Sequence, residues 1–279
     1  MKLYLDCYAC VVRQTLQVCR SVGVSEEDQV HVLRTMLCKL HDADPTITPP
    51  EMGAQMHALI RELVDVEDPY QEEKKISTAE ALSYYPSMKK KVERADDPFE
   101  TAVRLAIAGN IIDFGVHDHY DLQGTIQQSL IQPLAINHLS ALRAAVKRAE
   151  TILYLADNAG ETVFDRLLIE TINKPVIYAV KDAPVLNDAT MADAKAAGVD
   201  RVARVISCGA RSPGTILERC SEDFVALFDK ADVIIAKGQG NYEALSSERG
   251  HIFFLLKAKC VVISKDLGVP VGSMVVKKR

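Results

Sequence analysis

The chain lacks a hydrophobic run long enough to span a membrane, and its first residues lack the apolar core of a signal peptide. It also lacks a basic stripe, and its basic residues are not interleaved with aromatic ones as they are in nucleic-acid binders. Hydrophobic residues make up 48% and charged residues 25%, with a net charge of −5, which is ordinary for a globular protein. We therefore expect a cytoplasmic protein that binds neither membranes nor nucleic acids.

Internal repeats, low-complexity segments and flexible linkers are missing as well. A chain of 279 residues can bury a full core in one large domain or in two modest ones. Without a linker, the parts of the chain are expected to form one compact body. Homo-oligomer formation is left open by the sequence.

The seven cysteines form an odd set without a secretory context, which favours reduced thiols over a disulfide framework. Cys7 and Cys10 form a C-x-x-C pair, but no second pair of cysteines or histidines follows at zinc-finger spacing. The pair can be half of a metal site, a redox pair or two small core residues. The sequence His117-Asp118-His119 is not predicted to bind metal, because residues two apart share a face only on a strand.

Up to about residue 150 the hydrophobic periodicity is almost wholly helical. Helices are expected after Ser25, over residues 51–63, from Asp68-Pro69 to about Arg94, and from Asp97-Pro98 onward. Beyond residue 150, short β-branched runs alternate with helical segments. The predicted strands are 151–156, 175–180, 201–207, 232–236 and 260–264, and the predicted helices are 161–172, 190–197, 213–228 and 242–247.

This alternation predicts an α/β fold with a Rossmann-like three-layer αβα C-terminal part, in which a mostly parallel sheet is covered on both faces. The C-terminal part packs against an all-helical N-terminal part. We place a helical N-terminal domain at residues 1–95 and an α/β metal- and phosphate-binding domain at residues 96–279. The terminal Lys277-Lys278-Arg279 is expected to be a solvated tail.

Polar residues follow several of the predicted strands. Asp157 and Asn158 follow the first, Lys181 and then Asp188 follow the second, and Lys237 follows the fourth. The carboxyl ends of parallel strands lie at one edge of a sheet, so these groups should converge. Oxygen ligands suit Mg²⁺ or Mn²⁺, and the N-terminus of the helix after Asp157 favours an anion. A cation next to an anion site indicates phosphate chemistry.

The segment from Lys237 to Asn241 contains two glycines, which let backbone N–H groups approach an anion, and a lysine with a compact positive charge. It matches neither the Walker A spacing nor G-x-G-x-x-G. Taken alone, it is equally consistent with a turn at the start of a helix.

Four motifs of the chain occur together in one known family. They are Gly-Asn-Ile-Ile-Asp-Phe-Gly at 109–115, Asp-Asn-Ala-Gly-Glu at 157–161, Lys-Gly-Gln-Gly-Asn-Tyr-Glu at 237–243 and Leu-Leu-Lys-Ala-Lys-Cys at 255–260. Over almost its whole length the chain resembles the metal-dependent damage-control phosphatases, formerly a domain of unknown function. The Cys7-x-x-Cys10 pair looks like the mark of the prokaryotic subfamily.

The resemblance implies a divalent metal ion (Mg, Mn, Co or Ni) bound by Asp157, Asn158 and Asp188. It also implies that Lys257 contacts the phosphate, so that Asp157, Asn158 and Lys257 are the catalytic candidates. The residues expected to bind the substrate, a small phosphorylated metabolite, are Asn110, Asp113, Glu161, Lys181, Lys237, Gly238, Gln239, Gly240 and Asn241. Where the family elsewhere has Arg-Thr-x-Lys, this chain has Phe254-Leu255-Leu256-Lys257 and lacks the arginine.

From the residues alone, several of these positions have a second interpretation. Asp188 can cap the helix that follows it, Lys257 can be a solvated lysine, and Asn110 with Asp113 can close a helix C-terminus.

The predicted reaction is hydrolysis of phosphomonoesters of small metabolites, such as sugar phosphates or damaged phospho-metabolites. Asp157 is either a metal ligand only or also a nucleophile that forms an aspartyl-phosphate. Two alternatives remain: an S-adenosylmethionine-dependent carboxyl methyltransferase, disfavoured by the single glycine after the first strand, and a non-enzymatic metal or redox protein using the cysteine pair.

Overall fold

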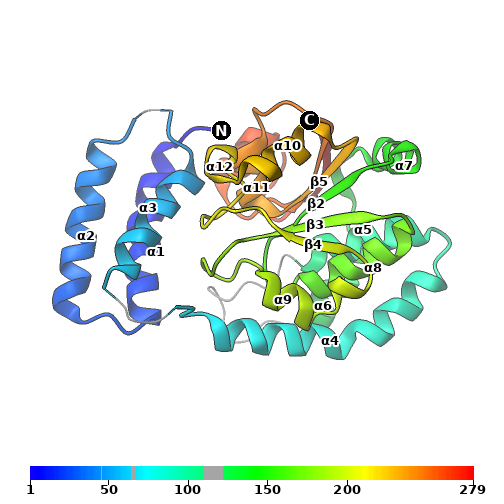
Figure 1. The fold of residues 1–279 in the computed structure, drawn as a ribbon, viewed down its shortest axis with the longest axis horizontal. Coiled ribbons are helices and arrows are strands. Elements are labelled where there is room, and N and C mark those ends of the chain that lie inside the picture. The colour runs from blue at the N-terminus through cyan, green and yellow to red at the C-terminus, as the bar shows by residue number, and fades with distance from the viewer. Residues whose placement is uncertain (45, 64–66, 110–121) are drawn as a thin grey trace.

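The structure is a computed structural model that describes residues 1–44, 46–63, 67–109 and 122–279. The first three helices, α1 (Leu5–Ser21), α2 (Glu26–His41) and α3 (Pro49–Arg61), form a bundle at one end of the molecule (Figure 1). The side chain of Ser25 caps α2, and a Thr48–Glu51 capping box begins α3. The bundle has its own apolar core, which also includes Val262 from the C-terminal part.

The long helix α4 (Gln71–Glu93) leaves the bundle and runs along the α/β part (Figure 1). It packs against α5 (Pro98–Gly109) and α8 (Thr162–Ile172), and its Ala81 and Met88 belong to the same core as the sheet. Lys74 of α4 pairs with Asp68 at 2.6 Å and with Asp193 at 3.0 Å. Part of the segment before residue 96 is therefore packed into the α/β core, and the division at residue 95 stays a prediction.

A seven-stranded sheet forms the centre of the α/β part, in the order β1-β7-β6-β5-β2-β3-β4. Strands β2 to β6 are mutually parallel where they pair, whereas β7 runs antiparallel to β6 and parallel to β1. The strands are β1 (Leu134–Asn137), β2 (Ile152–Leu155), β3 (Val176–Val180), β4 (Arg204–Ser207), β5 (Val233–Lys237), β6 (Ile252–Lys257) and β7 (Met274–Lys278).

Helices cover both faces of the sheet, because alternate residues of the central strands enter two separate cores. Ile152 and Tyr154 of β2 face the core that contains α5, α7 (Leu139–Arg148) and α8. Leu153 and Leu155 face the core that contains α10 (Glu222–Lys230), α11 (Gly238–Leu245) and α12 (Val261–Leu267). The remaining helices α6 (Leu122–Ile131) and α9 (Met191–Ala196) lie on the first face through Ile126 and Ala194.

The predicted fold class is confirmed: helices come first, and a mostly parallel sheet with interleaved helices follows. Four of the five predicted strands are present as β2, β3, β4 and β5. The predicted strand at 260–264 is wrong, because this β-branched segment forms α12, whose Val262 and Ile263 are buried in two cores. Tertiary packing has overridden local β-propensity here.

Three strands, β1, β6 and β7, were not expected. Lys277 and Lys278 belong to β7 and pair with β6, and the backbone N–H of Arg279 donates to Ile252 O, so the expected tail is part of the sheet, with the side chains of Lys278 and Arg279 exposed. The predicted helix at 213–228 is split, since α10 begins only after Ser221, whose hydroxyl accepts the Phe224 N–H. The last predicted helix, at 242–247, begins earlier than expected, at Gly238.

Among the described residues, no helix is both long and apolar enough to cross a membrane.

A glycine at the end of α5 sets how closely α5 approaches α8. A Cβ at Gly109 would lie 2.9 Å from a ring carbon of Phe164, whereas a Cβ at Gly53 in α3 would meet only Pro213, at an ordinary 3.5 Å. We expect Gly109→Ala to lower the free energy of unfolding by about 1–3 kcal/mol through overpacking. Gly53→Ala should raise it by about 0.5–1 kcal/mol, because alanine favours helix interiors. Urea unfolding of both variants measures this; equal effects would contradict the packing argument.

Candidate active site

The site lies where the chain reverses its direction of travel across the sheet. From β2 the chain proceeds to β3 and β4, then returns to the other side of β2 to form β5. Helix α8, which follows β2, and α11, which follows β5, therefore cover opposite faces. Between the carboxyl ends of two such neighbouring strands a crevice opens, which is the usual ligand position in parallel sheets.

Two loops meet in this crevice. The segment after β2 is bonded to the segment after β3: the Ala189 N–H donates to Asp157 O at 2.8 Å, and the Ala159 N–H donates to Asn187 O at 2.8 Å. An isolated antiparallel bridge joins Asn158 to Asp188. These backbone bonds bring residues that are about thirty positions apart side by side.

A cavity of about 350 Å³ opens at this point. Asp157, Asn158 and Asp188 line it together with Gly214, Gln239, Gly240 and Lys259. Its opposite wall comes from the helical part, through Gln14 and Gln17 of α1 and Tyr70. The structure thus brings the three predicted metal ligands to one cavity.

The donor set fits a hard divalent cation. Two carboxylates and one amide offer oxygen atoms, which Mg²⁺ and Mn²⁺ prefer. Asn158 Nδ2 donates to Asp157 Oδ2 and to Glu161 Oε2, both at 3.2 Å, and this turns its amide oxygen away from those carboxylates. In the described part of the chain, no cluster of three or more His, Cys, Asp or Glu side chains offers a competing metal site. A cation here would keep coordination positions for water and phosphate.

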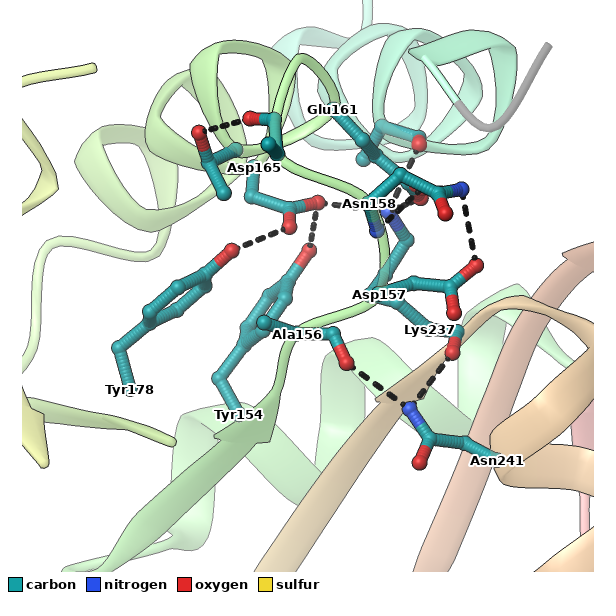
Figure 2. Close-up of polar contacts among 12 residues, drawn as sticks. Tyr154, Ala156, Asp157, Asn158, Glu161, Asp165, Tyr178, Lys237 and Asn241 are labelled. Atoms are coloured by element: carbon teal, nitrogen blue, oxygen red, sulfur yellow. Dashed lines mark hydrogen bonds and ion pairs between the residues drawn. The ribbon is translucent and has the colours of Figure 1, made fainter. Parts of the chain in front are cut away.

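A fully buried ion cluster contacts Asn158, which lines the cavity; the cluster is drawn in Figure 2. Lys237 Nζ contacts Glu161 Oε1, Asp165 Oδ1 at 2.6 Å and Ala106 O at 2.8 Å. Burial opposes the charge of Lys237, but Asp165 and Glu161 outweigh it and raise the pKa of Lys237 to about 12. Burial raises the pKa of Asp165 despite the neighbouring ammonium. The ammonium group of Lys237 thus forms ion pairs with two carboxylates.

Two tyrosines complete the cluster from the sheet. Tyr154 and Tyr178 each donate a 2.7 Å hydrogen bond to Asp165, one to each carboxylate oxygen, from adjacent strands β2 and β3 (Figure 2). Burial raises the pKa of both phenols, so they remain protonated donors. Asp165 is therefore held by three donors in a fixed position.

Glu161 connects this cluster to the cavity. Its Oε1 contacts Lys237, while its Oε2 accepts from the backbone N–H of Asn158 at 3.4 Å and from the side-chain amide at 3.2 Å. Lys237 thus orients Glu161, and Glu161 orients Asn158. The sequence places Glu161 and Lys237 among the substrate-binding residues; in the structure both are fully buried, below the residues that line the cavity.

The turn between β5 and α11 passes directly against Asp157. Gly238 has φ +76°, and a Cβ at this position would lie 1.8 Å from Asp157 Oδ2. Only glycine both adopts this left-handed conformation easily and leaves room for the carboxylate. The first turn of α11, with Gln239 and Gly240, borders the cavity, so its N-terminal N–H groups are available to an anion there.

At the helix that follows Asp157 the arrangement differs from the expectation. Glu161 stands at the N-cap of α8, and the first residue of that helix, Thr162, is fully buried outside the cavity lining. The helix that starts at the cavity is α11 instead.

Asn241 and Lys181 join the loops that surround the cavity. Asn241 Nδ2 donates to Ala156 O at 3.0 Å and to Lys237 O at 2.8 Å, and its oxygen accepts from Thr215. Lys181 Nζ donates to Gly214 O and lies 3.6 Å from Asp188 Oδ2. Both side chains are at least 95% buried, so the structure places them behind the cavity wall.

Two other predicted positions lie elsewhere. Lys257, at the end of β6, is half-buried outside the described lining of the cavity, and burial followed by the charge of Lys259 lowers its pKa. Asn110 and Asp113 lie outside the described residues, as does the His117–His119 segment.

Sequence reasoning missed Lys259, Gln14 and Gln17, which line the cavity, and Asp165 with its two tyrosines below it. Two signals were available. The first is Asp165: an acid on a buried helix needs a partner of opposite charge or a hydrogen-bond donor. The second is the position of Lys259, which lies only two residues beyond the predicted phosphate contact Lys257. The sequence gave no such signal for Gln14 and Gln17 of α1, because polar residues on a helix ordinarily face solvent.

Comparisons with known proteins find relatives over almost the whole chain. A family model described as the damage-control phosphatase ARMT1-like domain matches residues 3–275. A damage-control phosphatase of Pyrococcus horikoshii is 39% identical over 99% of this chain and 97% of its own length. One of Archaeoglobus fulgidus is 35% identical over 81% of each chain. The crystal structure of a DUF89 family protein from Pyrococcus horikoshii superposes with a TM-score of 0.90 and 36% identity, covering 100% of this chain and 99% of the other.

The buried ion cluster predicts an unequal response to two lysine replacements. Lys237→Met keeps most of the volume but removes the cation between two buried carboxylates, so we expect the free energy of unfolding to fall by about 3–5 kcal/mol. Lys75→Met is the control, since Lys75 pairs with Glu72 at 2.6 Å but both side chains are more than half exposed; it should cost less than about 1 kcal/mol. Chemical denaturation of both variants measures the difference, and similar losses would refute the role of Lys237.

Proposed function

The chain belongs to the damage-control phosphatase ARMT1-like domain family, and we propose that it hydrolyses small phosphate monoesters with a divalent metal ion bound by Asp157, Asn158 and Asp188. By homology the protein is an enzyme and a damage-control phosphatase. Its substrates are proposed to be small phosphorylated metabolites, either sugar phosphates or damaged phospho-metabolites.

The observation that carries the proposal is the convergence of three oxygen-bearing side chains and a helix N-terminus on one cavity at the sheet switch point. The carboxylates and the amide offer a place for a cation, and the first turn of α11 offers one for an anion. A phosphate monoester bound between them would contact both.

The residues of the chain divide the chemical work. A bound divalent cation would supply Lewis acidity and neutralise part of the phosphoryl charge. The N–H groups at the start of α11 and the ammonium of Lys259, which border the cavity, would orient the phosphate and stabilise charge on its oxygens. Lys257 remains a predicted phosphate contact. Asp157 either holds the cation only or also attacks phosphorus, so that the ester P–O bond breaks, the alcohol leaves with a proton and an aspartyl-phosphate forms; water then hydrolyses it to aspartate and inorganic phosphate.

The buried cluster acts through Asn158. Glu161, fixed by Lys237, accepts hydrogen bonds from the backbone N–H and from the side-chain amide of Asn158. It thereby holds the amide oxygen of Asn158 in one direction. Such support behind a metal ligand is typically worth about 10–100-fold in metal affinity or activity.

The proposed function predicts metal-dependent phosphate release. Metal-free protein reloaded separately with Mg²⁺, Mn²⁺, Co²⁺ or Ni²⁺ should release phosphate from a panel of sugar phosphates. Asp157→Asn and Asp188→Asn should each lower kcat/KM by roughly 100-fold or more, because the negative charge of a metal ligand is lost while the shape of the side chain is kept. Phosphate release that is independent of metal, or that survives both substitutions, would refute the proposal.

The glycine beside Asp157 provides a second prediction with a matched control. Gly238→Ala forces either the backbone or the Asp157 carboxylate to move, and we expect kcat/KM to fall by roughly 100-fold. Gly268 has a similar φ of +69°, but a Cβ there would meet nothing within 4 Å. Gly268→Ala should therefore cost only about 1–2 kcal/mol of stability and leave turnover unchanged. Equal losses of turnover would show that backbone strain, and not the contact with Asp157, is responsible.

A further inference from the structure

A second and larger cavity of about 540 Å³ adjoins the candidate active site. We call it the distal compartment. It shares with the active-site cavity the lining residues Gln14, Gln17, Leu186, Pro213, Gln239 and Gly240. The two spaces therefore lie side by side along α1. A phosphate group needs only the active-site cavity. Ligand sites for whole organic molecules typically measure about 300–1,000 Å³, and the volume of the distal compartment lies in this range.

The walls of the distal compartment are mostly apolar and come from both parts of the chain. Cys7 and Cys10 from α1, Met56 from α3, and Cys260 with Val262 from the start of α12 line it. The C-x-x-C pair thus lies on the helix face that borders the compartment. Burial raises the pKa of the Cys7 thiol, so it contributes a neutral, apolar surface.

A glycine keeps this compartment open. Gly53 lies inside α3, where alanine would be more stable, and a Cβ there would meet only Pro213 at an ordinary 3.5 Å. Packing does not require a glycine at this position. The missing side chain leaves room in the compartment that Gly53 lines.

A buried histidine side chain also lines the space, and it lines a smaller neighbouring pocket as well. His57 is 6% exposed, and its Nε2 has no hydrogen-bond partner among the residues that the structure describes. Burial, followed by the charge of Arg61, lowers its pKa to about 3, so the imidazole is neutral near pH 7. A buried ring nitrogen without a partner costs free energy, which a hydrogen-bonding group of a ligand would recover.

We propose that the distal compartment binds the organic half of the substrate, and that the preferred substrates are phosphate monoesters with an extended apolar stem and a hydrogen-bonding group that reaches His57. This inference rests on the proposed function for the position of the phosphate. It gives the C-x-x-C segment a role in the wall of a specificity site.

Calorimetric binding to the full chain in the presence of Mg²⁺ tests the stem. Octyl phosphate has seven more methylenes than methyl phosphate and should bind at least about tenfold more tightly. Gly53→Leu should fill the compartment, abolish this advantage and leave methyl phosphate unaffected. Ala58→Leu is the matched control, because Ala58 is exposed on the same helix and lies outside the lining. Equal affinities for the two phosphates in the parent protein would overturn the proposal.

The second measurement does not depend on turnover. Cys10 is exposed and lines the compartment, so octyl phosphate should slow its alkylation by a maleimide, whereas methyl phosphate should not. Cys38, exposed on α2 outside the lining, is the internal control. If Gly53→Leu does not fold, the protein alkylated at Cys10 serves as the form with a filled compartment. Octyl phosphate should bind to this form as weakly as methyl phosphate. Protection of Cys10 and Cys38 to the same extent would refute the inference.

His57 is tested separately. His57→Phe should weaken binding of ω-hydroxyoctyl phosphate but not of octyl phosphate; the same loss for both would remove His57 from the proposal. Selective binding and protection without phosphate release from any ester would refute the proposed function and leave the compartment intact. Phosphate release with equal preference for short and long esters would support the proposed function and refute the distal compartment as the site for the organic half.

Discussion

The contact between Lys237 and the carboxylates of Glu161 and Asp165 is the interaction on which the site depends. All three side chains are fully buried, so each charge would be costly without the others. The cluster joins the end of β5 to the first turns of α8, and Tyr154 and Tyr178 attach it to the middle of the sheet (Figure 2). Through Glu161 it reaches Asn158, so that a structural ion cluster and a candidate metal ligand share one carboxylate.

Around this cluster, the site is assembled from loops that belong to different strands. Gly238 after β5 lies against Asp157 after β2, and the segment that carries Asp188 is bonded to the same turn through backbone hydrogen bonds. Lys181 and Asn241 form hydrogen bonds with the loop that contains Gly214 and Thr215. The oxygen atoms proposed to hold the cation are thus positioned by buried polar contacts on a rigid sheet, which favours precise geometry at the site.

The helical part contributes a wall and a compartment. Helix α1 borders both cavities, with its glutamines next to the active site and its cysteines farther along. The α/β part supplies the candidate metal ligands, while the bundle supplies part of the space in which the rest of a substrate would lie. Under the proposed function, the chemistry would stay with the α/β part and the bundle would influence the choice of substrate.

Several elements follow from the sequence because their signals are local. The β-branched run that is followed by Asp157 and Asn158 predicts β2 and the site at its end, and the Ser25 cap predicts α2. The convergence of Asp157 with Asp188 also follows, since parallel strands end at one edge. Only the tertiary structure decided that Val262 and Ile263 form a helix, that Lys237 is buried beneath the cavity, and that Gln14 faces it. The reason is physical: caps and periodicity act within a few residues, whereas burial depends on which distant segments pack together.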